Sequence, residues 1–167
     1  MMDDRDSQLL AGMKAVLAEL TAGGQPDRML GALDRAYQEL VGHKLITFFR
    51  VDDRTGDVER IYSTDLPTHP VGPSSRKNMM GSEWGQAILV RREAFLADTM
   101  EDLRRIFPQH GALAALGCGS CLSYPAVYDG RCVGAVNLCH EEKHYTENRS
   151  RLGRWLAPLM LPAVLGP

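Results

Sequence analysis

The residues most able to do chemistry in this chain are its cysteines, which cluster in the last third of the sequence. Cys118 and Cys121 are separated by two residues, Cys132 follows, and Cys139 is next to His140. A Cys-x-x-Cys pair with further Cys and His residues is the ligand pattern of a structural zinc site, and the same spacing occurs in redox motifs. The metal hypothesis depends on how the surrounding strands pair. Whether Cys118 and Cys121 are redox-active is left open by the sequence.

The region that carries these cysteines has the pattern of a β-hairpin. Two runs that alternate between apolar and polar residues, 122–128 and 131–139, flank the dipeptide Asp129-Gly130. This dipeptide is a strong signal for a two-residue hairpin turn. We therefore predict that the two runs are antiparallel strands whose register is set by the turn.

This register separates the cysteines. Cys132 pairs with Val127, and Cys121 pairs with Leu138, so Cys121 and Cys132 share one face of the sheet. They lie roughly 20 Å apart along the ladder at about 3.3 Å per residue, and Cys139 points to the other face. Four such thiols cannot hold one ion, so we predict no metal site. Cys121 and Cys132 are predicted to be buried apolar side chains.

Composition and charge narrow the functional classes. With 167 residues and 44% hydrophobic residues, the chain is predicted to be one domain that buries roughly 68–70% of its unfolded surface. Its net charge of −2 is mixed along the sequence, so no basic stripe predicts binding to nucleic acid. No apolar run approaches the roughly 20 residues of a membrane span, and the acidic first residues differ from a signal peptide. We expect a cytoplasmic protein with reduced cysteines.

The remaining periodicities predict an α+β fold around an antiparallel sheet of five to six strands. The predicted helices are at 7–20, 26–41, 82–91, 99–107 and from Thr146 to about 165, and the further strands are at 44–51, 58–64 and 94–97. Thr99 and Asp102 form a capping-box-like start for the helix at 99–107, and Pro158 requires the last helix to kink or restart. Residues 65–81 are rich in Pro and Gly and predict a long loop over the sheet. The terminal helices are expected to pack on one face of the sheet.

Several of these features together resemble the GAF domain family. Pro125 before the hairpin turn and Gly134 after it lie where the GAF hairpin has an aliphatic-Pro strand end and a Val-Gly return strand. The helix entry at 81–85 and the strand end Ala97-Asp98 also match. The resemblance covers about residues 25–165. It divides the chain into an N-terminal helix at 1–24 and a GAF-like domain at 25–167.

The resemblance implies a pocket on the sheet face opposite the terminal helices, roofed by the loop and the short helices. Strand parity and family likeness together give a predicted ligand site made of Thr47, Phe49, Tyr62, Arg76, Trp84, Asp98, Tyr124, Asn137 and Cys139. A cationic roof with Arg76 and a neutral amide at Asn137 suits a small anionic or amide-bearing metabolite. The identity of the ligand and of any cofactor stays open.

The function implied by the resemblance is that of a stand-alone sensory or regulatory module that binds a small molecule and has no catalytic activity. Its signal would pass to a partner protein, and a homodimer is expected through Leu10, Met13 and Leu17 of the first helix. One alternative is a thiol-dependent enzyme similar to the free methionine-(R)-sulfoxide reductase of this family, although two positions of that enzyme's cysteines fall at Trp84 and near Ala114. The other alternative is a structural dimerisation domain without a ligand.

Overall fold

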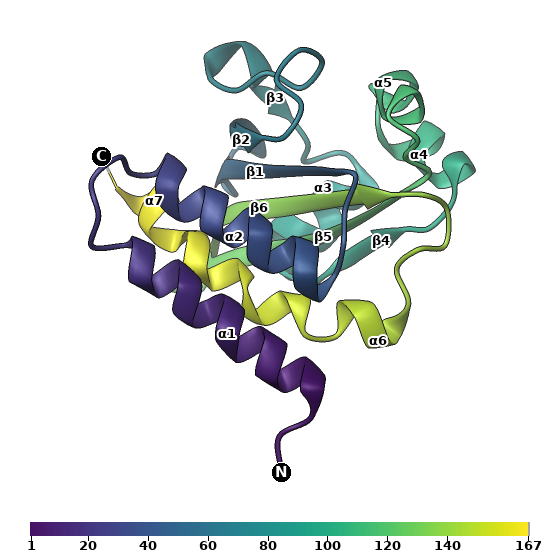
Figure 1. Cartoon of the computed structure of the whole chain (residues 1–167). Helices are drawn as coiled ribbons and strands as arrows, with labels where there is room; N and C mark the ends of the chain where they lie inside the picture. Colours follow the sequence, from purple (N-terminus) through teal and green to yellow (C-terminus); the bar gives the residue numbers. More distant parts are fainter. Residues whose placement is uncertain (167) are drawn as a thin grey trace.

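The computed structural model describes residues 1–166 and is built on one antiparallel sheet with helices on both faces (Figure 1). The strands are β1 (Leu45–Asp52), β2 (Asp57–Ser63), β3 (Lys77–Asn78), β4 (Phe95–Ala97), β5 (Ser120–Tyr128) and β6 (Arg131–His140). The helices are α1 (Asp4–Glu19), α2 (Asp27–Leu40), α3 (Glu83–Gly85), α4 (Met100–Ile106), α5 (His110–Ala115), α6 (Glu147–Ser150) and α7 (Leu161–Leu165). This is the predicted α+β architecture.

The six strands lie in the order β3-β2-β1-β6-β5-β4, so β1 and the hairpin strand β6 form the centre of the sheet. Residues 45–49 of β1 are buried without interruption. Successive side chains of a strand point to opposite faces, and an unbroken buried run therefore requires that both faces of β1 are covered. This is the position from which β1 can contribute to two separate clusters of apolar side chains.

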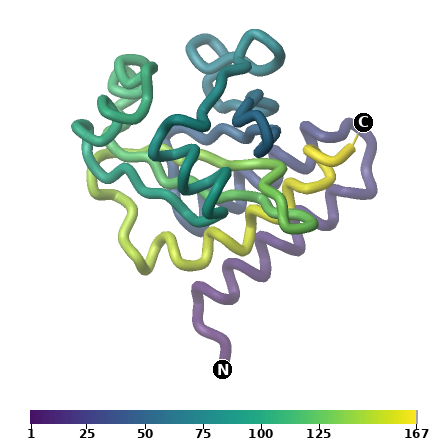
Figure 2. The backbone as a smooth tube through the Cα atoms, turned by 180° about the vertical axis from the view of Figure 1, so that it is seen from behind, coloured from purple at the N-terminus to yellow at the C-terminus, as the bar shows by residue number. Residues whose placement is uncertain are grey.

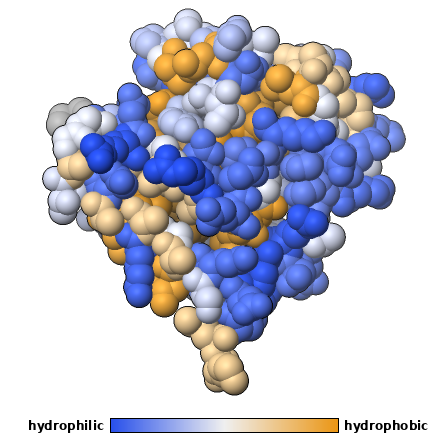
Figure 3. Space-filling view, viewed as in Figure 1, coloured by the Kyte–Doolittle hydropathy of each residue, from blue (hydrophilic) through white to orange (hydrophobic). Residues whose placement is uncertain are grey.

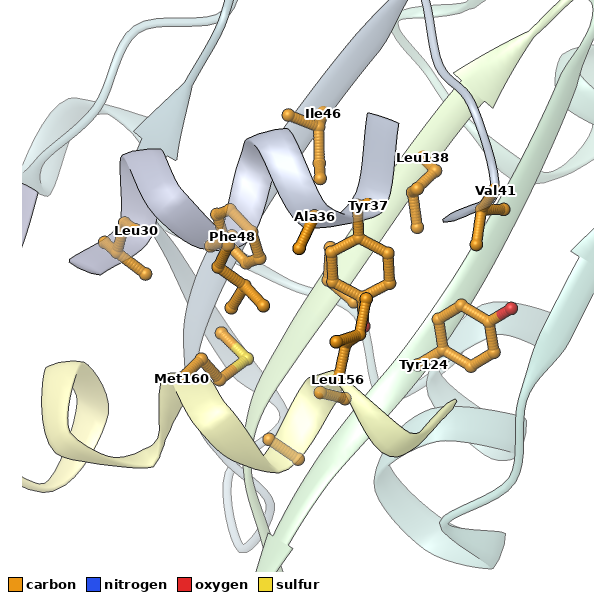
Figure 4. Packing of buried hydrophobic residues seen from close by; sticks show 14 of the residues in the cluster. Leu30, Ala36, Tyr37, Val41, Ile46, Phe48, Tyr124, Leu138, Leu156 and Met160 are labelled. Carbon is orange, nitrogen blue, oxygen red and sulfur yellow. The ribbon is translucent and has the colours of Figure 1, made fainter. Parts of the chain in front are cut away.

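One face of the sheet is covered by α1, α2 and the C-terminal segment, as predicted (Figures 1 and 4). Apolar residues of α2 recur at helical spacing and are buried, among them Leu33 and Tyr37. The Tyr37 hydroxyl donates to the carbonyl of Gly153 at 3.0 Å, which ties α2 to the C-terminal segment. That segment is not one kinked helix: α6 and α7 are separated by two short 3₁₀ turns, with Pro158 in the first turn of the second.

The opposite face carries the second cluster of buried apolar residues under α3, α4, α5 and the loop between β2 and α3. Figure 2, seen from behind, shows the α3 region and the chain that follows it crossing in front of the sheet. α4 begins with the predicted capping box. The Thr99 hydroxyl accepts from the backbone N–H of Asp102, and the Asp102 carboxylate accepts from the backbone N–H of Thr99. None of the helices within the described residues is long and apolar enough to cross a membrane.

The hairpin between β5 and β6 has the predicted turn but not the predicted register. Asp129 and Gly130 both have positive φ, at 50° and 72°, as a tight hairpin turn requires. Val127 lies opposite Cys132 as expected, but an irregularity between Ala126 and Val127 shifts every pair beyond it by one residue.

The shifted register corrects the predicted placement of the cysteines. Cys121 lies opposite Cys139 and not opposite Leu138. Cys118, Cys121, Cys132 and Cys139 all belong to the apolar cluster under the short helices, so the prediction that Cys139 points away from the others was wrong. The physical reason is that a one-residue slip moves every later side chain of the strand to the other face.

Candidate functional site: a basic cavity between the sheet and its roof

A small cavity lies between the sheet and the segments that cover its second face. Its volume is about 30 Å³, and strands β1, β2, β5 and β6 form its floor while the long loop and the α4–α5 region form its roof. The lining residues are Leu45, Thr47, Phe49, Arg60, His69, Lys77, Phe107, Gln109, Leu113, Cys121, Asn137 and Cys139. Apolar walls with a few polar groups are typical of ligand sites in proteins.

Arg60 is a deeply buried cation of this cavity, with 4% of its surface exposed. One terminal nitrogen of its guanidinium donates to the carbonyl of Pro70 at 2.8 Å, and the group lies 5.3 Å from the ring centre of Phe49. Its Nε has no hydrogen-bond partner among residues 1–166. Burial lowers the pKa of Arg60, and a buried charge without a counter-charge is costly.

Lys77 and His69 bring further basic groups to the same cavity. Lys77 Nζ donates to Gln109 Oε1 at 3.0 Å, and burial together with the nearby Arg60 lowers the pKa of Lys77 to about 8. His69 is 4% exposed, and its Nδ1 lies 3.1 Å from Asp65 Oδ2. Burial lowers the pKa of His69, and the positive charges of Arg60 and Lys77 lower it further. The three basic groups are therefore close enough to repel one another.

No carboxylate lines this cavity in the part of the chain that the structure describes. Asp65, the acidic residue next to the cavity, is engaged by the His69 ring and by the Thr68 hydroxyl. The positive charge of Arg60 and Lys77 is thus left without an internal counter-ion. Such an arrangement attracts an anion, because charge-assisted hydrogen bonds to it replace the water that burial removes.

The floor offers a fixed polar group at Asn137. Trp84 Nε1 donates to Asn137 Oδ1 and to Ser123 Oγ, both at 3.0 Å, and Ser123 Oγ donates to Asn137 Oδ1 at 2.6 Å. An indole N–H can only donate, so these bonds determine which atom of the Asn137 amide is the oxygen. Because Oδ1 is occupied, the NH₂ group of Asn137 remains as the donor that the floor can offer.

The thiols of Cys118 and Cys139 are held in their neutral form. The structure describes all four cysteines and shows each as a free, buried thiol. The interaction with Cys121 and burial raise the pKa of Cys139 well above its usual value, and burial raises the pKa of Cys118 to about 11. Lys77 lines the same cavity as Cys121. Neutral buried thiols are poor nucleophiles.

The structure brings together five of the nine residues of the predicted site. Thr47, Phe49, Asn137 and Cys139 line the cavity, and Trp84 contacts it through its hydrogen bond to Asn137. These residues come from β1, β6 and the start of α3.

Two predicted residues lie on the other face of the sheet. Tyr62 faces α2, where its hydroxyl donates to Asp34 Oδ2 at 2.7 Å. Tyr124 belongs to the cluster under the terminal helices (Figure 4) and stacks on Tyr37 with ring centres 6.1 Å apart. Both displacements have the same cause. An irregularity in the pairing of β1 with β2 places Tyr62 opposite Phe48. The shifted pairing of β5 with β6 places Tyr124 opposite Val136, which belongs to the cluster under the terminal helices.

The last two predicted residues are outside the cavity lining. Arg76 is exposed and pairs with Glu59 on the outer surface. Asp98 lies between β4 and α4, where its backbone N–H donates to Asp102 at 3.0 Å.

Sequence reasoning missed Arg60, His69 and Lys77. The signal for Arg60 was its place two residues after the buried Val58 in strand β2, since such residues share one face. The signal for Lys77 was its place next to Arg76, since adjacent residues of an extended segment face opposite ways.

Comparison with known proteins gives the family. A model of the GAF domain family matches residues 26–164. The chain belongs to the GAF domain family. This GAF chain has a TM-score of 0.73 to the GAF domain of a phosphoenolpyruvate-protein phosphotransferase from Coxiella burnetii, at 17% identity over 98% of this chain and 95% of that one.

Two further solved structures show the same fold. The GAF domain of a phosphoenolpyruvate-protein phosphotransferase from Acinetobacter has a TM-score of 0.68 at 11% identity, covering 99% of both chains. The GAF domain of a two-component sensor histidine kinase from Bacillus halodurans has a TM-score of 0.66 at 15% identity, covering 83% of this chain and 92% of that one. A search among characterised proteins found no match. At these identities the neighbours establish the fold, which is typical of small-molecule-binding sensory and regulatory domains.

Proposed function

We propose that this GAF domain is a sensory or regulatory module without catalytic activity, and that it binds a small anionic metabolite in the basic cavity. The observation that carries the proposal is the meeting of Arg60, His69 and Lys77 in a buried site that no carboxylate of the described chain lines. An oxyanion would meet the unpartnered Nε of Arg60 and the ammonium of Lys77. The free NH₂ of Asn137 would donate to a carbonyl or amide oxygen of the same ligand.

The size of the cavity limits the part of the ligand that fits beneath the closed roof. A volume of about 30 Å³ exceeds the roughly 10–15 Å³ that a water molecule requires, so it suits one small charged group. A larger metabolite would place its anionic group in this cavity, and the remainder of the molecule would displace the roof. The hydrogen bond from Lys77 to Gln109 joins the loop to the residue that precedes α5. If Lys77 donated to a bound ligand instead of to Gln109, this link between the loop and α5 would be lost. Ligand binding would thereby change the structure of the roof.

A matched pair of variants tests the anion site. Lys77→Met removes the cation inside the cavity, and Arg76→Met removes its exposed neighbour. We expect calorimetric titration with formate, acetate, phosphate and short dicarboxylates to show binding that Lys77→Met weakens by about tenfold or more, the effect of a charge-assisted hydrogen bond of about 1.5–3 kcal/mol. Arg76→Met should bind as the wild type does.

Two results would contradict this assignment. Amines of matched size that bind better than the acids would reverse the expected charge preference. Equal effects of the two variants would show that binding does not use the cavity. If none of the acids or amines binds or raises the melting temperature, the structural dimerisation domain becomes the better description.

We also propose a homodimer formed through α1. This helix packs on α2 with one fully buried residue, Val16, while Leu10 and Leu17 are 39% and 48% exposed. Figure 3 shows apolar side chains between polar ones along this side of the molecule. The exposed residues are seven apart and therefore lie on one stripe of the helix, which is the arrangement that a two-fold helix pair needs.

Signal output through a partner protein and a cytoplasmic location complete the proposal. The ground for the location is that the four cysteines are free, which fits a reducing compartment.

A further inference from the structure

A second group of chemically active side chains lies outside the cavity, at the turn that follows β6. His140, Glu141 and His144 each offer one ligand atom, and these atoms all lie within 4.8 Å of one another. The sequence here is His-Glu-Glu-Lys-His. On a helix this spacing places two histidines on one face and is typical of zinc peptidases. In this chain the residues form a strand end and a turn, so Glu141 lies beside the imidazoles.

The backbone of this turn is held in place by neighbouring residues. The Ser120 hydroxyl donates to the carbonyl of Glu141 at 2.7 Å, and the backbone N–H of Gly119 donates to the carbonyl of His140 at 2.7 Å. Tyr145 packs edge-on against both imidazole rings and donates to the carbonyl of Gly42 at 2.9 Å. The potential ligands are therefore carried by a fixed segment and not by a free chain end.

Both histidines present a nitrogen with a lone pair. His144 Nε2 lies 3.3 Å from the carbonyl oxygen of Val41; a carbonyl can only accept, so Nε2 carries the proton and Nδ1 is left with its lone pair. A backbone carbonyl that holds the second ring nitrogen is a common feature of metal-bound histidines. His140 Nδ1 accepts from the backbone N–H of Glu141 at 2.9 Å. It therefore also has a lone pair, which a metal ion could bind in place of this N–H.

The two rings are stacked, with centroids 3.5 Å apart and planes 6° from parallel. Burial and the facing His144 lower the pKa of His140, and burial also lowers the pKa of His144. Cys139 precedes the cluster but lines the basic cavity, so its thiol faces away from these ligands.

We propose that His140, His144 and Glu141 form a binding site for a divalent transition-metal ion of the Zn²⁺, Co²⁺ or Ni²⁺ class. Two imidazoles and one carboxylate are a donor set that these ions accept, with water in the remaining position. Parallel rings direct their lone pairs in parallel, so one ring must turn about its Cβ–Cγ bond and the stack must open when the ion binds. The nearby cations Lys44 and Arg149, which also lower the pKa values of the pair, oppose binding. The site is therefore weaker than a preorganised structural zinc site.

Calorimetric titration of the untagged full chain with Zn²⁺ tests the proposal, and titration with Co²⁺ identifies the donor atoms. We expect one ion per chain, with affinity reduced by about tenfold or more in His140→Asn and in His144→Asn, in line with the large losses that follow changes around metal ligands. His110→Asn is the matched control, since His110 lies on α5 and should leave binding unchanged. Thermal unfolding of each variant without metal shows whether it is folded.

Three results would overturn the assignment. The first is a failure of Zn²⁺ to bind to the folded wild-type chain, and the second is affinity that neither His140→Asn nor His144→Asn reduces. The third is a sulfur-to-cobalt charge-transfer band in the Co²⁺ complex, which would place the ion on the cysteines. An absorption spectrum typical of nitrogen and oxygen ligands, lost in both histidine variants, would support it.

Discussion

Replacement of Lys77 by Met should stabilise the folded chain at neutral pH, although it removes a hydrogen bond. The pKa of Lys77 falls from its usual 10.5 to about 8, and at 1.36 kcal/mol per pKa unit this corresponds to about 3 kcal/mol of unfavourable free energy for the charged side chain in the folded state. Loss of the bond to Gln109 offsets about 1 kcal/mol of the gain. We expect a net increase of about 2 kcal/mol in the free energy of unfolding at pH 7.

The lowered pKa of Lys77 also determines how this stabilisation depends on pH. Between about pH 8 and pH 10.5 the unfolded chain binds more protons at Lys77 than the folded chain does, so the stability of the wild type rises with pH in this range. The advantage of Lys77→Met should therefore be full below about pH 8 and shrink as the pH approaches 10.5. The difference between variant and wild type is the quantity to follow, because groups that do not interact with Lys77 contribute equally to both.

Urea denaturation of wild type, Lys77→Met and Arg76→Met at pH 7 and pH 10 provides the measurement. Arg76→Met serves as the control, because its pair with Glu59 is on the surface and exposed pairs contribute about 0–1 kcal/mol. A Lys77→Met chain that is less stable than the wild type at pH 7 would refute the reasoning. So would an advantage that does not change with pH.

Three further predictions concern packing, thiols and assembly. Gly85→Ala should prevent folding or cost several kcal/mol, because a Cβ there would lie 1.9 Å from the carbonyl oxygen of Met79, whereas Gly81→Ala has nothing within 4 Å and should be tolerated; circular dichroism melting compares them. Cys132 should react slowly with a thiol reagent in the native protein, because burial raises its pKa to about 12; labelling as fast as in urea would contradict this. Deletion of residues 1–22 should convert the proposed dimer to a monomer, and an unchanged mass by light scattering would place the interface elsewhere.

The sequence alone was sufficient for the architecture. Helical spacing in 26–41, strand alternation on both sides of Asp129-Gly130 and the Thr99–Asp102 cap are local signals, and the structure contains each of them. These local signals predict the GAF fold, because the order of the helices and strands and the position of the hairpin restrict which of their faces can be buried. The inward-facing residues of the central strands β1 and β6, such as Thr47 and Asn137, also followed from this pattern.

The tertiary structure decided which residues of the other strands reach the cavity. The irregular pairings each place one extra residue in one strand, between Cys132 and Gly134 in β6 and between Arg60 and Tyr62 in β2. They place Arg60 in the cavity and turn Tyr62 and Tyr124 to the helical face.

The roof depended on tertiary structure as well. Arg76 and Lys77 are adjacent and face opposite ways, but the long loop has no periodic pattern from which to read which of them lines the cavity. A strand's hydrophobic pattern specifies its two faces, but a single extra residue exchanges them at little cost in local free energy, and only the packing of the whole domain selects between the two.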